Sequence, residues 1–306
     1  MTNSIADMEE SKCFLITGTN TTENHPVIST FIKRAVTQRG AKLILADPRN
    51  IELAKFATVH LRQRPGTDIA WLNGMMNVII AEGLANEAFI SERTENYDAL
   101  KETVKKYTPE YVEKITGIPA GDLKTAARLY ATSGASSIVY AMGITQHVTG
   151  TDNVKSCANL AMLTGNIGRP GTGVNPLRGQ NNVQGACDMA CLPGNLPAYK
   201  KVAEDAERKP FEDAWGVKLP GKPGLTIPLV VEGAAKGTIK ALYVMGENPM
   251  MSDPDITHVE HAFKNLELLI VQDIFLTETG RLAHVVLPSA AWAEKEGTFT
   301  NTERRV

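Results

Sequence analysis

The sequence predicts an α/β protein made of two Rossmann-like αβα lobes with mainly parallel sheets. Short apolar segments of the kind that form buried parallel strands alternate with segments of helical periodicity. This alternation occurs near the start of the chain and begins again after residue 238. A chain of 306 residues is also long enough to bury two hydrophobic cores. We expect the first lobe at residues 1–180 and the second, incomplete at its C-terminal end, at 181–306.

The first lobe is expected to begin with a βαβ unit. KCFLIT (12–17) and KLILADP (42–48) are short apolar runs typical of strands. Between them, the apolar residues of segment 27–40 recur at helical spacing, after Pro26 and up to Gly40. Proline favours the start of a helix and glycine its end. Four helices should follow, the first capped by Thr67 or Asp68 and the third by Thr108, over 67–83, 94–107, 108–117 and 121–134.

The α/β pattern then resumes with a strand at 136–143 and a helix at about 153–163. The glycine-rich segment 164–185 is expected to have no regular structure, and loops of that length are usually functional or disordered. We expect segment 194–238, rich in lysine, proline and glycine, to be a surface excursion. Three further strands are predicted at 239–249, 266–273 and 284–289.

The composition excludes several classes of protein. Hydrophobic residues make up 43% and charged residues 22%, as in soluble globular proteins, and the net charge of -2 argues against a nucleic-acid partner. No apolar run approaches the roughly 20 residues that cross a bilayer, and the N-terminus does not read as a signal peptide. The four cysteines form no CxxC pair, so the sequence supports neither a disulfide framework nor a metal framework. Cys187 and Cys191, four residues apart, are expected to be ordinary thiols, with a pair of metal ligands as the alternative. A cytoplasmic protein without direct membrane insertion is expected.

Polar residues follow the predicted strands in a repeated arrangement. LIT-GTN and YVM-GEN each lead from a strand into glycine and asparagine, and Asp47 and Asp273 each end a strand. Ligands of parallel α/β sheets bind at the carboxyl ends of strands, where glycine permits close approach and a carboxylate can accept from a ribose hydroxyl or a guanine N–H. At any single position the simpler interpretation is favoured, with Gly18 and Gly246 as turns and Asp47 as the cap of a loop. Because the arrangement occurs twice, we favour an extended ligand that contains nucleotides; G-x-G-x-x-G is absent, so NAD is not favoured.

Arg178 lies in NPLRGQNNVQGACDM (175–189), which has no hydrophobic period. Its guanidinium matches a carboxylate and keeps its charge, and the amides around it can bind a ligand rich in heteroatoms. The alternative is an arginine that ties down the loop. The histidines, including His25 at a helix start and His147, form no metal-binding pair and are expected to cap, pack or face solvent.

The motifs, in chain order, resemble those of the molybdopterin oxidoreductase superfamily. More narrowly, they resemble the catalytic (alpha) subunit of molybdenum- or tungsten-dependent formate dehydrogenase. The resemblance covers essentially the whole chain, and NPLRGQNNVQGACDM is the segment that indicates the subfamily. The other motifs are GTNTTENHP, LILADPRNIELAKFA, YAMGITQH, AMLTGNIGRPGTGV, VMGENP and VQDIFLTETGRLAHVVLPSAAWAEKEGTFTN.

The resemblance implies that the two lobes are the central domains of such an enzyme. It implies two pyranopterin guanine dinucleotides (bis-molybdopterin guanine dinucleotide) that hold one molybdenum or tungsten atom, and oxidation of formate to carbon dioxide. Arg178 would bind the formate carboxylate, with Gln180 near the pterin. One guanosine arm would lie against Gly18, Asn20, Glu23, Asp47 and Arg49. The pterin path or the other arm would be lined by Met142, Gln146, Gly246, Glu247, Asp273 and Thr277.

The sequence departs from that family in what it lacks. Formate dehydrogenases carry four N-terminal cysteines for a 4Fe-4S cluster, and a selenocysteine or cysteine followed by histidine that binds the metal. No Cys-His dipeptide occurs in this chain. We therefore expect an internal fragment, inactive alone, whose partners are the missing N- and C-terminal domains and an iron–sulfur electron-transfer subunit in anaerobic metabolism. A coding region that restarts after a selenocysteine codon would account for Met1.

Two other functions are compatible with the sequence. One is a nitrate reductase-type molybdopterin oxidoreductase, which shares the motifs around 175–189 but is not expected to carry that segment itself. The other is a non-catalytic module that binds the cofactor, which the missing metal ligand would favour.

Overall fold

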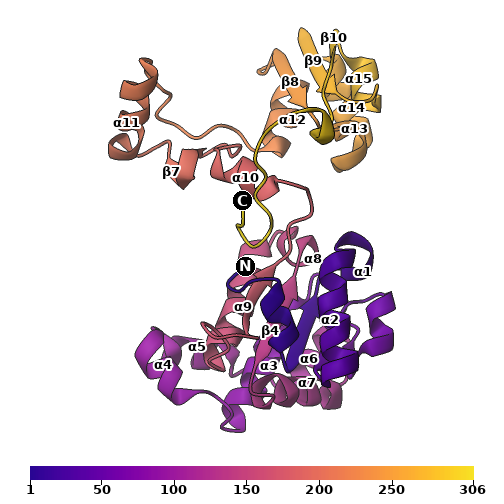
Figure 1. The fold of residues 1–306 in the computed structure, drawn as a ribbon, viewed down its shortest axis with the longest axis vertical. Coiled ribbons are helices and arrows are strands. Elements are labelled where there is room, and N and C mark those ends of the chain that lie inside the picture. Colours follow the sequence, from indigo (N-terminus) through magenta and orange to yellow (C-terminus); the bar gives the residue numbers. More distant parts are fainter. The chain divides into compact units, whose positions relative to one another are not determined.

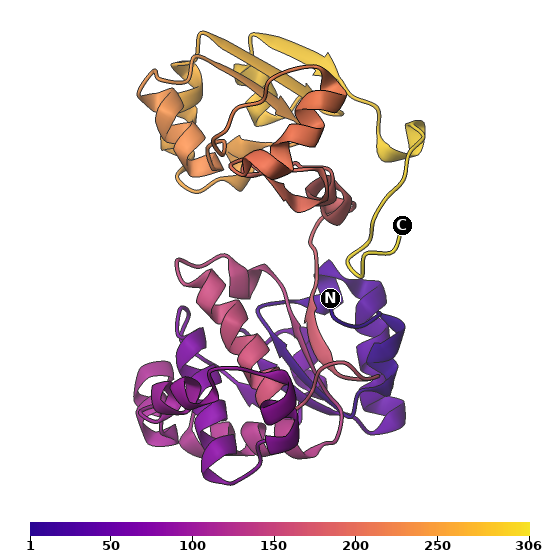
Figure 2. The same cartoon turned by 90° about the vertical axis from the view of Figure 1, so that its left-hand side faces the viewer.

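The computed structural model describes residues 1–306, and the chain forms two compact units. The first comprises Met1–Gln184 with Thr300–Val306, and the second comprises Gly185–Phe299. Figures 1 and 2 show most of the first unit in indigo to magenta and most of the second in orange to yellow. The lobe boundary expected at residues 180 and 181 stays a prediction. None of the helices has the length and apolar character that crossing a bilayer requires.

The first unit is built on a five-stranded parallel sheet with the strand order β3-β2-β1-β4-β5. The order reverses between β1 and β4, and ligands of open α/β sheets bind at such a switch point. The strands are β1 (Cys13–Thr17), β2 (Lys42–Ala46), β3 (Val59–Leu61), β4 (Ser136–Tyr140) and β5 (Gly173–Pro176).

The register of this sheet brings the ends of the strands to one level. Thr17 of β1 pairs with Ala46 of β2 and with Tyr140 of β4, and Tyr140 pairs in turn with Pro176 of β5. The residues that follow these strands therefore begin at one edge of the sheet, which we call the carboxyl edge.

Both faces of the sheet are covered, because alternate residues of a strand point to opposite sides. Leu15 packs with α3 (Asp68–Ala81), α7 (Ala120–Thr132) and α9 (Gly150–Leu163), whereas Phe14 and Ile16 pack on the side of α2 (Pro26–Arg39). Met75 and Met76 of α3 are fully buried and belong to the core on this side of the sheet. The other helices are η1 (Ala6–Glu10), α1 (Thr21–Asn24), η2 (Glu52–Phe56), α4 (Glu87–Arg93), α5 (Tyr97–Val104), α6 (Pro109–Thr116), α8 (Met142–Thr145) and α10 (Val183–Asp188).

The second unit holds a three-stranded parallel sheet with the order β10-β9-β8. Its core lies between this sheet and the helices α12 (Ile227–Ala235) and α14 (Ile256–Lys264), and includes Val231, Phe263 and Leu269. The remaining elements are β6 (Asn195–Leu196), η3 (Pro197–Tyr199), β7 (Lys200–Lys201), α11 (Asp205–Trp215), β8 (Ala241–Met245), α13 (Pro249–Ser252), β9 (Leu268–Asp273), α15 (Glu278–Leu282), β10 (Val285–Pro288) and η4 (Trp292–Glu294).

The predicted α/β class and the parallel arrangement are confirmed, but some elements differ from the expectation. Segment 164–185 is not free of structure, since it contains β5 and the start of α10. The excursion predicted at 194–238 includes α12, which buries Val231 and Ala234 in the core of its unit. Five helices rather than four lie between β3 and β4, because α4 was not expected. The Thr108 cap is confirmed, since its side chain accepts from the amide of Tyr111.

The cysteines provide a test of the fold. Cys13 and Cys157 are fully buried, and burial raises the pKa of each thiol to about 12. Cys191 is exposed and Cys187 is partly exposed. Because the thiolate is the reactive form, we expect two fast-reacting thiols per native chain with an aromatic disulfide reagent at about pH 8, and all four after unfolding in urea. Cys191→Ser should remove one fast equivalent and Cys13→Ser none; four fast equivalents in the native chain would contradict this fold.

Candidate functional site

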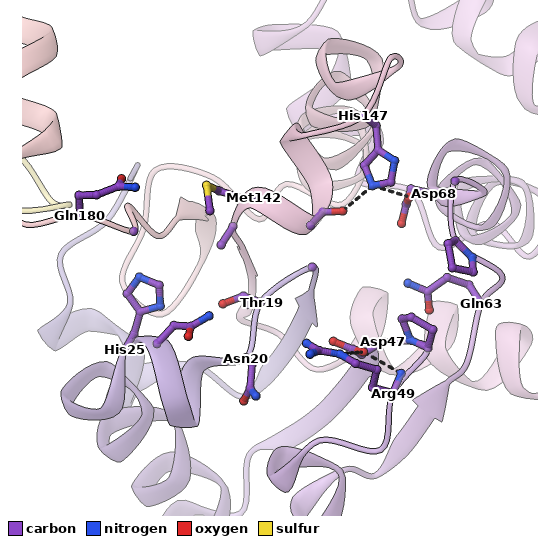
Figure 3. A pocket seen from close by; sticks show the side chains of 18 residues that line it. Thr19, Asn20, His25, Asp47, Arg49, Gln63, Asp68, Met142, His147 and Gln180 are labelled. Atoms are coloured by element: carbon purple, nitrogen blue, oxygen red, sulfur yellow. Dashed lines mark hydrogen bonds and ion pairs between the residues drawn. The ribbon is translucent and has the colours of Figure 1, made fainter. Parts of the chain in front are cut away.

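A pocket of about 600 Å³ lies at the carboxyl edge of the first unit's sheet. This volume is within the range of about 300–1,000 Å³ that small-molecule sites usually have. The lining residues come from the segments that follow β1, β2, β3, β4 and β5, so every strand of the sheet contributes (Figure 3). They are Gly18, Thr19, Asn20, Asn24, His25, Asp47, Pro48, Arg49, Gln63, Pro65, Gly66, Asp68, Ala141, Met142, Gly143, His147, Gly179 and Gln180.

Two glycines cross at the switch point. Gly18 has φ of +59°, and the amide of Gly143 donates to its carbonyl oxygen at 2.9 Å. A Cβ on Gly143 would lie 2.5 Å from the Cα of Gly18, which is closer than packed carbon atoms come. The two backbones can therefore approach each other this closely only because both residues are glycine. Both glycines also line the pocket.

Several buried polar atoms of the pocket have no partner within the protein. Thr19 Oγ1, Asn20 Oδ1, His25 Nδ1 and Gln63 Oε1 are buried and make no hydrogen bond. Buried polar groups are normally satisfied, and four of the unpaired atoms belong to residues that line this one cavity. The two amide oxygens can only accept, as carboxylates do. The pocket therefore suits a molecule that presents N–H and O–H groups, such as a purine-like base with a sugar.

One wall of the pocket is formed by Asp47 and Arg49. Asp47 is 4% exposed, and its Oδ1 accepts from the amide of Arg49 at 2.8 Å. The Nε of Arg49 lies 3.5 Å from the same oxygen, while most of its side chain is exposed. His60 Nε2 donates to the carbonyl oxygen of Asp47 at 2.9 Å. These contacts hold a carboxylate at the end of β2 and place a positive charge beside it.

Asp68 and His147 face each other on another side of the pocket (Figure 3). Asp68 is 5% exposed, its Oδ1 accepts from Trp71 Nε1 at 3.4 Å, and its Oδ2 lies 3.9 Å from His147 Nε2. The same nitrogen of His147 donates to the carbonyl oxygen of Gly143 at 2.9 Å. Burial raises the pKa of Asp68, whereas the contacts with Trp71 and His147 lower it by less. A ligand N–H at this carboxylate would remove the unfavourable effect of burial.

The raised pKa of Asp68 has a consequence for stability. The folded protein holds this proton to higher pH than the unfolded chain, whose carboxyl titrates near 3.8. Stability contributed by the protonated form is present below that value and is lost as the pH rises through the folded pKa. Asp68→Asn should therefore raise the urea midpoint of the ligand-free chain at about pH 7, and the gain should shrink towards about pH 4.5.

Asp152→Asn is the matched control for this prediction, because Asp152 also lies in the first turn of a helix but is exposed. It should give no such pH-dependent gain. An equal gain for Asp68→Asn at both pH values would mean that the buried charge is not its cause.

Arg178 follows β5 and borders the pocket through the next residues, Gly179 and Gln180. Its main chain is fixed on both sides: the amide donates to Thr302 Oγ1 at 3.0 Å, and the carbonyl oxygen accepts from His25 Nε2 at 2.7 Å. The residue itself is exposed, and its guanidinium takes part in none of the ion pairs. The main chain of Arg178 is thus held beside the pocket, and its side chain is not part of the pocket lining.

The pocket brings together part of the predicted site. Of the residues in the first unit, Gly18, Asn20, Asp47, Arg49, Met142 and Gln180 line it. Glu23, Gln146 and Arg178 are exposed and do not belong to its lining.

The other predicted site residues lie in the second unit, at the ends of β8 and β9. Gly246 and Glu247 follow β8, and Asp273 is the last residue of β9. Thr277 caps α15, since its Oγ1 accepts from the amide of Gly280 at 3.1 Å.

The strand ends of the two units follow the same design. Gly18 and Gly246 have φ of +59° and +65°, and each is followed two residues later by an asparagine that precedes a four-residue helix. Asp47 Oδ1 accepts from Arg49 N, and Asp273 Oδ1 accepts from Phe275 N, again two residues on. The repetition read from the sequence is therefore also present in the backbone of each unit.

Sequence reasoning missed several residues of the pocket. The sequence predicts Asp68 only as a helix cap, and His25 and His147 as capping, packed or solvated residues, yet all three line the cavity. Gln63 was not singled out. The usable signal is position, because Gln63 and Asp68 follow the short strand β3, and His147 follows β4 and the short helix α8. Recognising β3 as a strand would have placed Gln63 and Asp68 at the carboxyl edge.

Comparison with known proteins gives a consistent result. A sequence model of the family described as "Molybdopterin oxidoreductase" matches residues 1–306. The chain is 55% identical over 306 residues to "F420-dependent formate dehydrogenase 1 subunit alpha" of Methanococcus maripaludis. This alignment covers 100% of this chain and 45% of the relative. It is 45% identical over 305 residues to "Formate dehydrogenase H" of Escherichia coli, covering 99% of this chain and 42% of the relative. The chain thus spans less than half the length of these curated relatives.

A solved structure shares the fold. "Acetylene Hydratase from Pelobacter acetylenicus" aligns with 95% of this chain and 42% of its own, at a TM-score of 0.73 and 27% identity. Since its name denotes another reaction, the shared fold by itself does not identify a substrate.

Proposed function

Because this chain belongs to the molybdopterin oxidoreductase family, we propose that it is part of the catalytic subunit of a formate dehydrogenase, which oxidises formate to carbon dioxide. The observation that carries this proposal is Arg178, an exposed guanidinium whose main chain is fixed beside the pocket within NPLRGQNNVQGACDM. The names of the similar proteins agree with it.

Arg178 suits formate for reasons of charge and shape. A guanidinium offers two parallel N–H groups to a carboxylate and stays charged at any physiological pH. Formate is the smallest carboxylate, so this pairing supplies most of its binding. Oxidation removes one proton and two electrons and leaves carbon dioxide, which is neutral. Arg178 therefore binds the substrate more tightly than the product and favours product release.

The family's molybdopterin cofactor carries molybdenum or tungsten, and the pocket fits an arm of such a molecule. The unpaired acceptors Asn20 Oδ1 and Gln63 Oε1 match the N–H groups of a guanine or a pterin. In our assignment Asp47 accepts from the base or the ribose, Arg49 pairs with a phosphate, and Gly18 allows close backbone approach. Glu23, Met142, Gln146 and Gln180 lie along the same edge of the sheet and extend this site.

We assign a second guanine dinucleotide to the second unit. The support is the repeated design, in which Gly246 matches Gly18 and Asp273 matches Asp47, including the hydrogen bond two residues on. Glu247 follows Gly246 directly and Thr277 begins the helix after β9, and we assign both to the lining of the same arm. A bis-molybdopterin guanine dinucleotide cofactor accounts for two such sites in one chain.

When bound, the metal of the cofactor accepts the two electrons of formate. We assign the metal ligand and the 4Fe-4S cluster to other parts of the enzyme, since the Cys-His dipeptide of that family does not occur among these residues. An iron–sulfur subunit is the proposed electron acceptor of the complete enzyme.

The reaction is tested with the cofactor-loaded holoenzyme. Formate should reduce an artificial electron acceptor, and nitrate should not be reduced by the same preparation. Reduction of nitrate without formate oxidation would support the nitrate reductase alternative, and neither activity in a fully loaded protein would support a non-catalytic module.

The form of the cofactor is tested separately. Mild acid hydrolysis of the holoenzyme should release about two equivalents of GMP per metal atom, because each arm ends in a guanosine. One equivalent, or a different nucleotide, would reject the two-arm assignment whatever the activity.

A further inference from the structure

We propose that His25 and Thr302 are positioning residues that hold Arg178 in place to bind formate; we call this pair the Arg178 clamp. The clamp deepens the proposed function and rests on it, because it assigns to Arg178 the role of binding formate. Neither His25 nor Thr302 needs to touch the substrate.

Arg178 needs such support because of its place in the chain. It is the second residue after β5, an edge strand of four residues, and Gly179 follows it. Leu177 is buried, with 3% of its surface exposed. Its amide donates to the carbonyl oxygen of Tyr140 at 2.8 Å, and this is the last hydrogen bond between this segment and β4. Beyond Leu177 the sheet provides no further hydrogen bond to the peptide units of Arg178. The position of a long side chain is defined only if the position of its Cα is also fixed.

The clamp supplies the missing contacts from two distant parts of the chain. His25 lies 153 residues away, and its Nε2 donates to the carbonyl oxygen of Arg178 at 2.7 Å. Thr302 lies 124 residues away, and its Oγ1 accepts from the amide of Arg178 at 3.0 Å. The Thr302 hydroxyl donates in turn to the carbonyl oxygen of Pro176, also at 3.0 Å. Both peptide groups of Arg178 are therefore held by side chains.

Each partner is itself fixed. His25 precedes α2 directly, and the amide of Thr300 donates to Asn182 Oδ1 at 3.0 Å, which ties the segment of Thr302 to the loop that carries Arg178. Because the Nε2 of His25 donates to a carbonyl, a neutral ring has an unprotonated Nδ1. That atom is buried without a partner, and His25 lines the pocket. One ring therefore borders both the pocket and the peptide of Arg178.

The test uses variants that keep or remove a single contact. In His25→Gln the side-chain amide reaches about as far as Nε2 and keeps the donor, whereas in His25→Asn it ends at about the position of Nδ1. Thr302→Ser keeps the hydroxyl and Thr302→Val removes it at equal size. In the holoenzyme, His25→Asn and Thr302→Val should each raise KM for formate about tenfold with little change in kcat, since Arg178 still forms its pair once formate is bound.

Amide hydrogen exchange provides a readout that does not depend on activity. Exchange at the amides of Arg178 and Gly179 should accelerate about tenfold in His25→Asn and Thr302→Val, and should stay near wild type in His25→Gln and Thr302→Ser. Amides of β1 and β4 should keep their protection. His60→Ala is the matched control for this readout, because His60 makes the same kind of bond to a main-chain carbonyl elsewhere on the carboxyl edge.

The outcomes separate the two proposals. Unchanged exchange at Arg178 and Gly179 in both disrupted variants would overturn the clamp, and so would faster exchange with an unchanged KM. Wild-type holoenzyme that does not oxidise formate would reject the proposed function, and exchange would still decide whether the clamp exists.

Discussion

Replacing Arg178 by lysine should lower kcat/KM for formate about a thousandfold, because two charge-assisted hydrogen bonds in fixed geometry become one ammonium contact on a flexible stem. Arg178→Ala should lower it further. The substitution should leave the fold intact, since the residue is exposed and its structural contacts are made by the main chain.

Steady-state kinetics of the holoenzyme measure this effect. Arg128→Lys is the control: Arg128 is exposed on α7 and pairs with Glu82, away from the pocket lining. It should leave kcat/KM unchanged. Wild-type-like kinetics of Arg178→Lys, with cofactor content unchanged, would show that formate does not bind at this guanidinium.

Replacing Gly143 by alanine should lower the free energy of unfolding by about 2–4 kcal/mol. The added Cβ would lie 2.5 Å from the Cα of Gly18 and 2.7 Å from its carbonyl oxygen, and both are backbone atoms that cannot turn aside. The strand ends β1 and β4 would have to separate, which would also distort the pocket. Urea unfolding followed by circular dichroism measures the loss.

Substitutions at two other glycines distinguish the loss of stability caused by the clash from the loss caused by backbone conformation. Gly40 has φ of +73°, and no heavy atom lies within 4 Å of the place a Cβ would take, so Gly40→Ala should lose only about 1 kcal/mol through strain. Gly121 lies in α7 with open space around it, and Gly121→Ala should be neutral or stabilising. A loss for Gly143→Ala no larger than that for Gly40→Ala would mean that the crossing can relax.

Much of the fold could be predicted because its signals are local. Residues 13–16 of β1 are apolar and fully buried, and α2 begins at a proline and ends before a glycine. Periodicity and capping residues act over a few positions, so they can be read from the chain directly. The repeated strand ends are local too, since a glycine in the left-handed region and an aspartate that accepts two residues on are properties of single turns.

Other features have no local signal. β5 has little alternation, and Asn175 in its middle is buried only because its side chain donates to Ser137 Oγ at 2.7 Å across the sheet. Pairing with β4 makes this segment a strand. In the same way Asp68 reads as a helix cap, and its carboxylate joins the pocket only because β3 brings the start of α3 to the carboxyl edge.

The sequence by itself determined the fold class and the strand ends that form the pocket. Through the resemblance of its motifs it also indicated the family and Arg178 as the candidate residue for binding a carboxylate. Only the tertiary structure decided which side chains surround the cavity and what holds Arg178. His25 and Thr302 lie 153 and 124 residues from it, and hydrogen bonds between such distant residues leave no periodic pattern in the chain. Local sequence sets the conformation of each segment, whereas the meeting of segments depends on how the whole sheet orders its strands.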